Sequence, residues 1–266
     1  MGLLERTDLV ASYYTLAGAH LSRPPRHVLA DRARAAAAVG FTGMALAPAE
    51  TAAGIDAVVA ALDGFPAPEI EPLKGWDSGG RDDELAAFAL ADVFGSRQVT
   101  TIQLVDDQPA DLLAERFAGL CARAAEHGLT VGFEPRAHSP VATPAGAAAL
   151  VTASGAPNAG IVLDAYHVHR SGVSFEDIAP HARLVVSIQL NDARVPPGPD
   201  PAEDATEFRL VPGDGALDLP AWLRGLDRLG VDVPLAVEAL SREQNARPLD
   251  DAAARAVDGA RAVLGR

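Results

Sequence analysis

The sequence predicts an α/β fold of the (β/α)8 TIM-barrel type, and three observations indicate it. Short apolar, β-branched segments alternate with helical ones from end to end, which is typical of a parallel sheet with helical crossovers. The length of 266 residues, 48% of them hydrophobic, matches one such barrel. No Ser/Gly/Pro-rich linker or charge block divides the chain. We therefore expect a single TIM-barrel domain over residues 1–266.

Eight strand–helix units follow one another along the chain. Strands are expected at residues 9–18, 43–48, 68–73, 98–105, 130–135, 160–167, 184–192 and 235–240. The helices that follow them in turn are expected at 26–40, 54–64, 82–95, 110–128, 144–155, 175–182, 219–230 and 250–265. The third strand has a weak pattern and the sixth helix is short. The alternation nevertheless runs through the whole sequence.

Glycines mark the ends of many of these helices. A left-handed C-terminal cap favours glycine, and it stands just before the next strand at Gly40, Gly64, Gly95, Gly128, Gly155 and Gly230. A doubly wound open sheet is the rival architecture. Against it, no G-x-G-x-x-G motif follows the first strand, and polar residues end several strands instead of flanking one switch point. The pattern favours the barrel.

Composition excludes several classes of partner. The formal net charge of −14 argues against nucleic acid and anionic membranes, because phosphate binding needs a basic patch. Cys121 is the only cysteine, which excludes a disulfide framework and indicates a buried thiol. The first ten residues are too charged for a signal peptide, and no apolar run reaches the length of a membrane span. We expect a cytoplasmic protein.

Four polar residues stand near the ends of consecutive strands. They are Glu134 in TVGFEP, Asp164 in GIVLDAYH, Gln189 in LVVSIQLND and Glu238 in LAVEAL. A closed barrel brings the carboxyl ends of its strands to one face, where three carboxylates and an amide oxygen would repel one another without a cation. Four oxygen donors suit Mg²⁺ or Mn²⁺ rather than Co²⁺ or Zn²⁺. The sequence therefore predicts one divalent-metal site.

Each of these residues also has a plainer interpretation. Glu134 could pair with Arg136, and Asp164 could cap a helix or turn. Gln189 could be a hydrogen-bonded core amide, whereas Glu238 lies in so apolar a strand that it needs a partner or a metal. The occurrence of all four at successive strand ends favours the metal site.

The segments GFEP, LDAYH, IQLNDA, RLVPGDG and VEAL resemble, in order and spacing, the xylose-isomerase-like TIM barrel superfamily. That superfamily contains sugar and sugar-phosphate isomerases and epimerases, inosose and 3-dehydroshikimate dehydratases, and endonuclease IV. The resemblance covers the second half of the chain, and the first half matches only in its strand–helix rhythm. It implies that the four strand-end residues are the metal ligands, that His167 faces the substrate, and that Arg209 is held by the PGDG loop.

Two features depart from the superfamily pattern. Ketose epimerases of the group usually have histidine where this chain has Gln189, whereas bacterial 3-dehydroshikimate dehydratases resemble it there. The second strand, ending at Leu46 to Pro48, lacks the acidic or histidine residues that many relatives have. Endonuclease IV needs several histidines and a basic groove, which this acidic chain does not offer.

The resemblance implies an enzyme that acts on a small keto-sugar or related polyhydroxy carbonyl compound. A divalent ion on a carbonyl oxygen stabilises the enolate formed by proton removal. Glu134 and Glu238, on non-adjacent strands, could act as acid and base in an isomerase or epimerase, the reading that we place first. The alternative is a dehydratase, in which His167 or His169 protonates the departing hydroxyl. A second alternative is a non-catalytic sugar-binding barrel.

Further residues are candidates for substrate contacts. Arg209 could bind a carboxylate or phosphate through both of its terminal nitrogens, or be an exposed loop residue. Asn191 is expected on the same side of its strand as the metal ligand two residues before it. Trp76 could stack on a sugar ring or lie in the core. His138 and His169 are substrate contacts or solvated loop residues.

Residues 194–207 are rich in proline and acidic residues and follow the seventh strand. We expect them to arch over the site as a lid, with a disordered insertion as the alternative. The expected partner is a small carbohydrate-like substrate. The resemblance is compatible with a homodimer or homotetramer.

Overall fold

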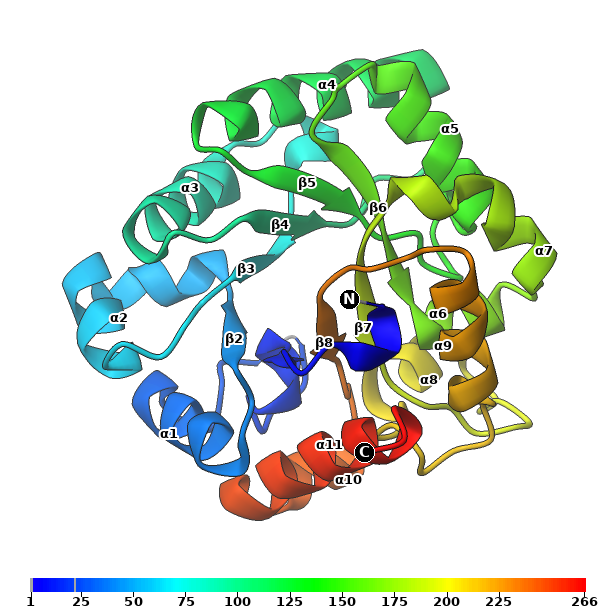
Figure 1. The fold of residues 1–266 in the computed structure, drawn as a ribbon. Coiled ribbons are helices and arrows are strands. Elements are labelled where there is room, and N and C mark those ends of the chain that lie inside the picture. Colours follow the sequence, from blue (N-terminus) through cyan, green and yellow to red (C-terminus); the bar gives the residue numbers. More distant parts are fainter. Residues whose placement is uncertain (1, 22) are drawn as a thin grey trace.

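The computed structural model describes residues 2–21 and 23–266, and within them eight parallel strands close into a barrel. Neighbouring strands pair in chain order from β1 to β8, and β8 pairs with β1. Helices form an outer ring, in which α11 lies beside α1 and completes the circle (Figure 1). The predicted (β/α)8 TIM barrel is therefore confirmed.

The strands lie close to their expected places. They are β1 (Val10–Ala11), β2 (Gly43–Leu46), β3 (Glu69–Leu73), β4 (Gln98–Thr101), β5 (Thr130–Phe133), β6 (Ala159–Asp164), β7 (Val185–Leu190) and β8 (Leu235–Val237). The first strand is much shorter than expected. Beyond it, the Thr15 hydroxyl donates to the Val237 carbonyl and accepts from the Ala239 amide, so side-chain hydrogen bonds replace the strand ladder.

The helices lie in the connections between successive strands and after the last strand. They are α1 (Leu29–Val39), α2 (Ile55–Leu62), α3 (Asp82–Phe94), α4 (Ala110–Glu126), α5 (Pro144–Ser154), α6 (Ala165–Arg170), α7 (Phe175–Ile178), α8 (Pro201–Glu207), α9 (Leu219–Arg228), α10 (Arg242–Ala246) and α11 (Leu249–Val263). The helix expected at 175–182 ends early, and a 3-10 turn, η5 (Ala179–Leu184), follows it with Pro180 in its first turn. In the described part of the chain, none of the helices is long and apolar enough to cross a membrane.

The apolar core fills the layer between the barrel and its helices. Trp76 is part of it, because its ring is 2% exposed and packs 5.4 Å from Phe117 and 6.2 Å from Phe133 between ring centroids. Its indole N–H donates to the Ile102 carbonyl at 2.9 Å. The structure thus has Trp76 in the core, the alternative weighed for it, with its polar group hydrogen-bonded inside the protein.

Two glycines on neighbouring strands make room inside the barrel. Gly132 on β5 and Gly160 on β6 are register partners, and the Val186 side chain packs over both positions. A Cβ atom added at Gly160 would lie 2.2 Å from Val186 Cγ1 and 2.9 Å from the Leu184 carbonyl oxygen. Only glycine leaves that space free.

We therefore expect Gly160→Ala to destabilise the barrel by about 1–3 kcal/mol through overpacking. Urea unfolding followed by circular dichroism measures the change. Gly146→Ala is the matched control, because its added Cβ would meet nothing closer than 3.4 Å. A Gly160→Ala variant as stable as the wild type would show that the Val186 contact is not tight in solution.

Candidate active site and metal centre

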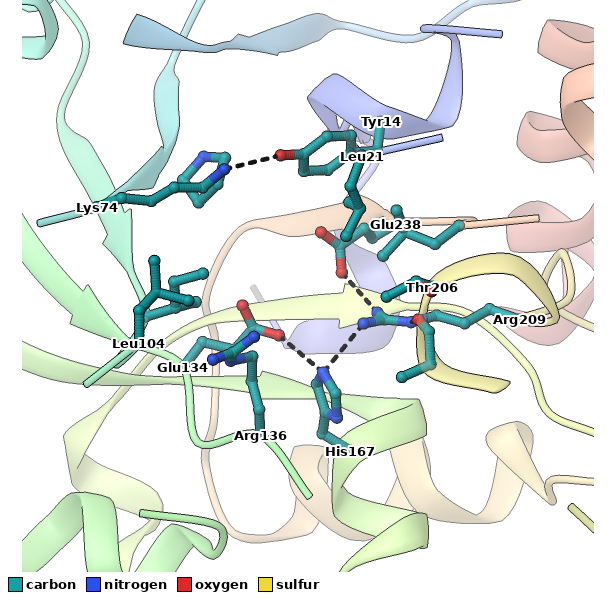
Figure 2. Close-up of a pocket in the computed structure, with 14 residues that line it drawn as sticks. Tyr14, Leu21, Lys74, Leu104, Glu134, Arg136, His167, Thr206, Arg209 and Glu238 are labelled. Carbon is teal, nitrogen blue, oxygen red and sulfur yellow. Dashed lines mark hydrogen bonds and ion pairs between the residues drawn. The ribbon is translucent and has the colours of Figure 1, made fainter. Parts of the chain in front are cut away.

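The carboxyl ends of the strands open onto a pocket of about 180 Å³. Four of the expected site residues line it: Glu134, His167, Arg209 and Glu238. Figure 2 shows these side chains pointing toward one another across the pocket. The parallel strands explain this convergence, because all of their carboxyl ends face the same side of a barrel.

Backbone pairing fixes the strand ends that carry the expected metal ligands. Glu134 follows β5 directly, and its amide donates to the Thr101 carbonyl at 2.9 Å. Asp164 ends β6 and is the register partner of Gln189 on β7. The Glu238 amide, just after β8, donates to the Leu190 carbonyl at 2.9 Å. The barrel ladder thus holds the four residues near the carboxyl ends of their strands.

Asp164 has two structural roles at once. Its Oδ1 atom accepts the His167 amide at 2.8 Å and so caps α6. Its Oδ2 atom accepts from Asn191 Nδ2 at 2.5 Å and from Arg209 Nη1 at 3.0 Å. The Asn191 oxygen accepts the Tyr166 amide at 2.7 Å, so both ends of that side chain are bonded within the protein. Asn191 thus orients Asp164, and its expected contact with the substrate stays a prediction.

Arg209 lies among the acidic groups. Its Nη1 atom is 2.8 Å from Glu238 Oε2 and 3.0 Å from Asp164 Oδ2, and its Nε donates to the Ala205 carbonyl. Its Nη2 atom is 3.0 Å from His167 Nε2. One guanidinium therefore compensates part of the charge of three buried carboxylates, and the centre keeps an excess of negative charge.

Burial and the neighbouring charges shift the pKa values of the site residues. Burial raises the pKa of Glu134 well above its usual range, and the charges of Glu238 and Asp164 raise it further. Burial also raises the pKa of Glu238, with Arg209 opposing the rise. The pKa of His167 is well below its usual range because of burial and then of Arg209. Such a centre favours a bound cation, which would keep the carboxylates ionised.

The residues at this centre fit a divalent ion. Glu134, Asp164 and His167 each offer a ligand atom, and these atoms lie within 4.8 Å of one another. Gln189 is fully buried, and its Oε1 atom has no hydrogen-bond partner in the described part of the protein. A buried acceptor without a donor, beside a carboxylate, is satisfied when a cation lies between them. His167 Nε2 is also 3.0 Å from Arg209 Nη2, so two sets share Glu134 and Asp164 and differ in whether His167 or Gln189 is added.

The other two histidines expected at the site are His169 and His138, and the charge of His138 contributes to the lowered pKa of His167. His138 and His169 are exposed, and neither lines the pocket. His169 instead borders a separate hollow between α6 and α9. Their roles as substrate contacts, and that of His169 as proton donor of an elimination, stay predictions.

Sequence reasoning missed four residues of the site. Tyr14, Lys74 and Arg136 line the pocket, and Glu71 on β3 hydrogen-bonds to Gln189 from across the barrel. Two of the four had a signal in the sequence. Lys74 is the only lysine and follows an expected strand, and the Glu-x-Glu spacing at 69–71 places two acids on one side of that strand.

Residues 194–207 include α8, which lies at the pocket. Asp204 accepts hydrogen bonds from the Tyr166 hydroxyl at 2.8 Å, from Arg170 Nε at 2.9 Å and from the Gly198 amide at 2.9 Å. Ala205 and Thr206 form part of the pocket wall. The segment is thus an ordered cover and not a disordered insertion.

Part of the chain is similar in sequence to an enzyme. A segment of 159 residues is 33% identical to the 3-dehydroshikimate dehydratase of Pseudomonas aeruginosa strain PAO1. That segment is 59% of this chain but only 24% of the dehydratase, so the chain corresponds to a small part of that protein.

Solved structures show the same fold. The IOLI protein with a bound zinc atom is 18% identical and has a TM-score of 0.80, with 97% of this chain and 98% of that chain covered. A fusion of a xylose isomerase-like TIM barrel with a 4-hydroxyphenylpyruvate dioxygenase is 22% identical with a TM-score of 0.81, over 96% of this chain and 42% of the fusion. A family model described as xylose isomerase-like TIM barrel matches residues 33–262. The resemblance seen in the sequence is thereby confirmed: this chain belongs to the xylose isomerase-like TIM barrel family.

Proposed function

We propose that this chain is a metal-dependent dehydratase that acts on a small, acidic, polyhydroxylated ketone of the 3-dehydroshikimate type. The observation that carries the proposal is a pair of cations, Lys74 and Arg136, in the wall of a pocket whose centre is acidic. The 33% identity to a 3-dehydroshikimate dehydratase and the glutamine at position 189 support it.

The two cations have capacity for a ligand. Among the described residues, neither takes part in an ion pair within 4.0 Å. Arg136 Nη2 donates to the Gln103 carbonyl, and Arg136 Nε is buried without a partner. Lys74 Nζ has only a long contact of 3.5 Å with the Tyr14 hydroxyl, and burial lowers its pKa. A carboxylate on the substrate would accept hydrogen bonds from both Lys74 and Arg136. A neutral sugar would bring no negative charge to this wall of the pocket.

Glu134, Asp164, Gln189 and Glu238 would hold the divalent ion, and their four oxygen donors favour Mg²⁺ or Mn²⁺. Such an ion, when bound, stabilises negative charge that develops on a carbonyl oxygen. The competing set with His167 in place of Gln189 adds a nitrogen donor, which suits Zn²⁺. A panel of these ions therefore separates the two sets.

The protein's own groups account for the proton transfers of an elimination. Glu134 is placed to remove the proton next to the carbonyl group. The bond from carbon to the neighbouring hydroxyl then breaks, and the oxygen takes a proton and leaves as water. Of the two histidines expected as the donor, His167 lines the pocket, and Glu238, which was expected as an acid or base of the isomerase, lines it too. Arg209 and α8 enclose this part of the pocket and limit the access of water.

An isomerase or epimerase of a keto-sugar is the second candidate. It is favoured by the two carboxylates Glu134 and Glu238, which face the same pocket from non-adjacent strands. One of them would take a proton and the other would return one, which needs no loss of water.

The reaction class is tested first with the protein loaded with Mg²⁺, Mn²⁺ or Zn²⁺ and incubated in D₂O with 3-dehydroshikimate, inososes and ketoses. We expect mass spectrometry to show a product lighter by one water from 3-dehydroshikimate. Solvent deuterium in a product that keeps all its atoms would instead establish the isomerase or epimerase. Binding without any product would identify a sugar-binding barrel.

Removing the carboxylate of Glu134 tests its role as base. We expect Glu134→Gln to lower kcat by roughly 10²- to 10⁴-fold, because the amide cannot accept a proton. Steady-state kinetics measures the loss, and Glu126→Gln on the exposed face of α4 is the matched control. Unchanged turnover in Glu134→Gln would assign the base to another residue.

The acidic-substrate element of the proposal depends on Lys74 and Arg136. We expect Lys74→Met and Arg136→Met each to raise KM for the acidic ketone by roughly 10- to 100-fold, because each removes a charged hydrogen bond. Arg97→Met is the control, since Arg97 borders the hollow at the opposite end of the barrel. If the variants change KM for neutral ketoses as much as for the acidic ketone, the substrate needs no carboxylate.

A further inference from the structure

One hydrogen bond crosses the interior of the barrel just beneath the proposed metal site. Gln189 Nε2 on β7 donates to Glu71 Oε2 on β3 at 3.0 Å, and these strands lie on opposite sides of the eight-stranded ring. Glu71 is 2% exposed and Gln189 is 0% exposed. The pair is therefore isolated from solvent, where a hydrogen bond has its greatest effect on geometry.

Glu71 is itself held in place. Its other carboxylate oxygen, Oε1, accepts the Tyr13 amide at 3.0 Å. Its Oε2 atom accepts from Gln189 Nε2, so the end of Gln189 that faces Glu71 is the NH₂ group. The amide oxygen is then turned away from Glu71, and it is the atom left without a partner in the described structure.

The orientation of this amide decides whether the site can hold a cation. Glutamate and aspartate present an oxygen whichever way they rotate. A glutamine presents either an oxygen, which binds a cation, or an NH₂ group, which repels it. Among the four expected ligands, Gln189 alone has this ambiguity.

We propose that Glu71 is a positioning residue that fixes the Gln189 amide with its oxygen available to a divalent cation. The inference rests on the metal site of the proposed function and adds a residue that the site's own geometry does not include. Glu71 acts through Gln189, as groups behind metal ligands generally do, and losing such a group typically weakens metal binding by 10- to 100-fold.

The same strand provides a matched control. Glu69 precedes Glu71 by two residues, lies on the same side of β3, and is 5% exposed. Its Oε1 atom accepts from Gln98 and Thr100 on β4, and in the described structure it makes no hydrogen bond to Gln189. Glu69→Gln therefore changes a buried carboxyl group on the same side of β3 without releasing the amide.

The test measures Mn²⁺ affinity by electron paramagnetic resonance, which needs neither substrate nor turnover. We expect Glu71→Gln to weaken Mn²⁺ binding about tenfold or more, and Glu69→Gln to change it by less than about threefold. In a Gln189→Ala background, Glu71→Gln should cause no further loss, because the group through which it acts is gone. Circular dichroism and thermal melting of the metal-free variants check that each one folds.

Two results would overturn the inference. Wild-type affinity in Glu71→Gln would show that the amide orients itself. An equal loss in the wild-type and Gln189→Ala backgrounds would show that Glu71 acts by its charge or as a ligand. If Glu71→Gln does not fold, Glu71→Asp replaces it in the same cycle, because it keeps the charge but draws the carboxylate back from the amide. A wild-type protein that binds no divalent ion would instead remove the metal site itself.

Discussion

The concentration of buried carboxylates at one mouth of the barrel is the constraint on which the site depends. Glu134, Asp164 and Glu238 are held there by backbone pairing, with Arg209 as the cation that contacts two of them. Burying charges of one sign is costly unless opposite charge and hydrogen bonds offset it. The capping of α6 by Asp164 and the docking of α8 under Arg209 are parts of that compensation.

Much of the architecture could be predicted from the sequence, because it depends on local patterns. Apolar β-branched runs and terminal glycines place the strands and helices within a few residues of their observed positions. Strand β1 is the main exception. Its expected range continued to residue 18, but the Thr15 side chain makes the hydrogen bonds to Val237 and Ala239. A hydrophobic pattern does not predict that a side chain bonds in place of the backbone.

The site residues that stand at strand ends could be predicted from the sequence. Contacts between residues on opposite sides of the barrel could not. Glu134, His167, Arg209 and Glu238 line one pocket because their strands or loops end on one face. The link between Glu71 and Gln189 joins residues 118 positions apart, and a one-dimensional pattern cannot show it. Trp76 is an ambiguous case of another kind. An aromatic residue after a strand gives the same sequence pattern whether it lines a pocket or, as here, lies in the core.

The wall formed by Tyr14, Leu21, Pro72 and Lys74 has a consequence for the size of acceptable molecules. These residues border the reaction pocket on one side and a hollow of about 580 Å³ on the other. The inner chamber, at about 180 Å³, limits the ring or short chain that reacts. The outer hollow sets no comparable limit on a group attached to that ring or chain. For the proposed reaction, we therefore expect strict selectivity for the reacting portion of a ligand and tolerance of an extension that passes Lys74.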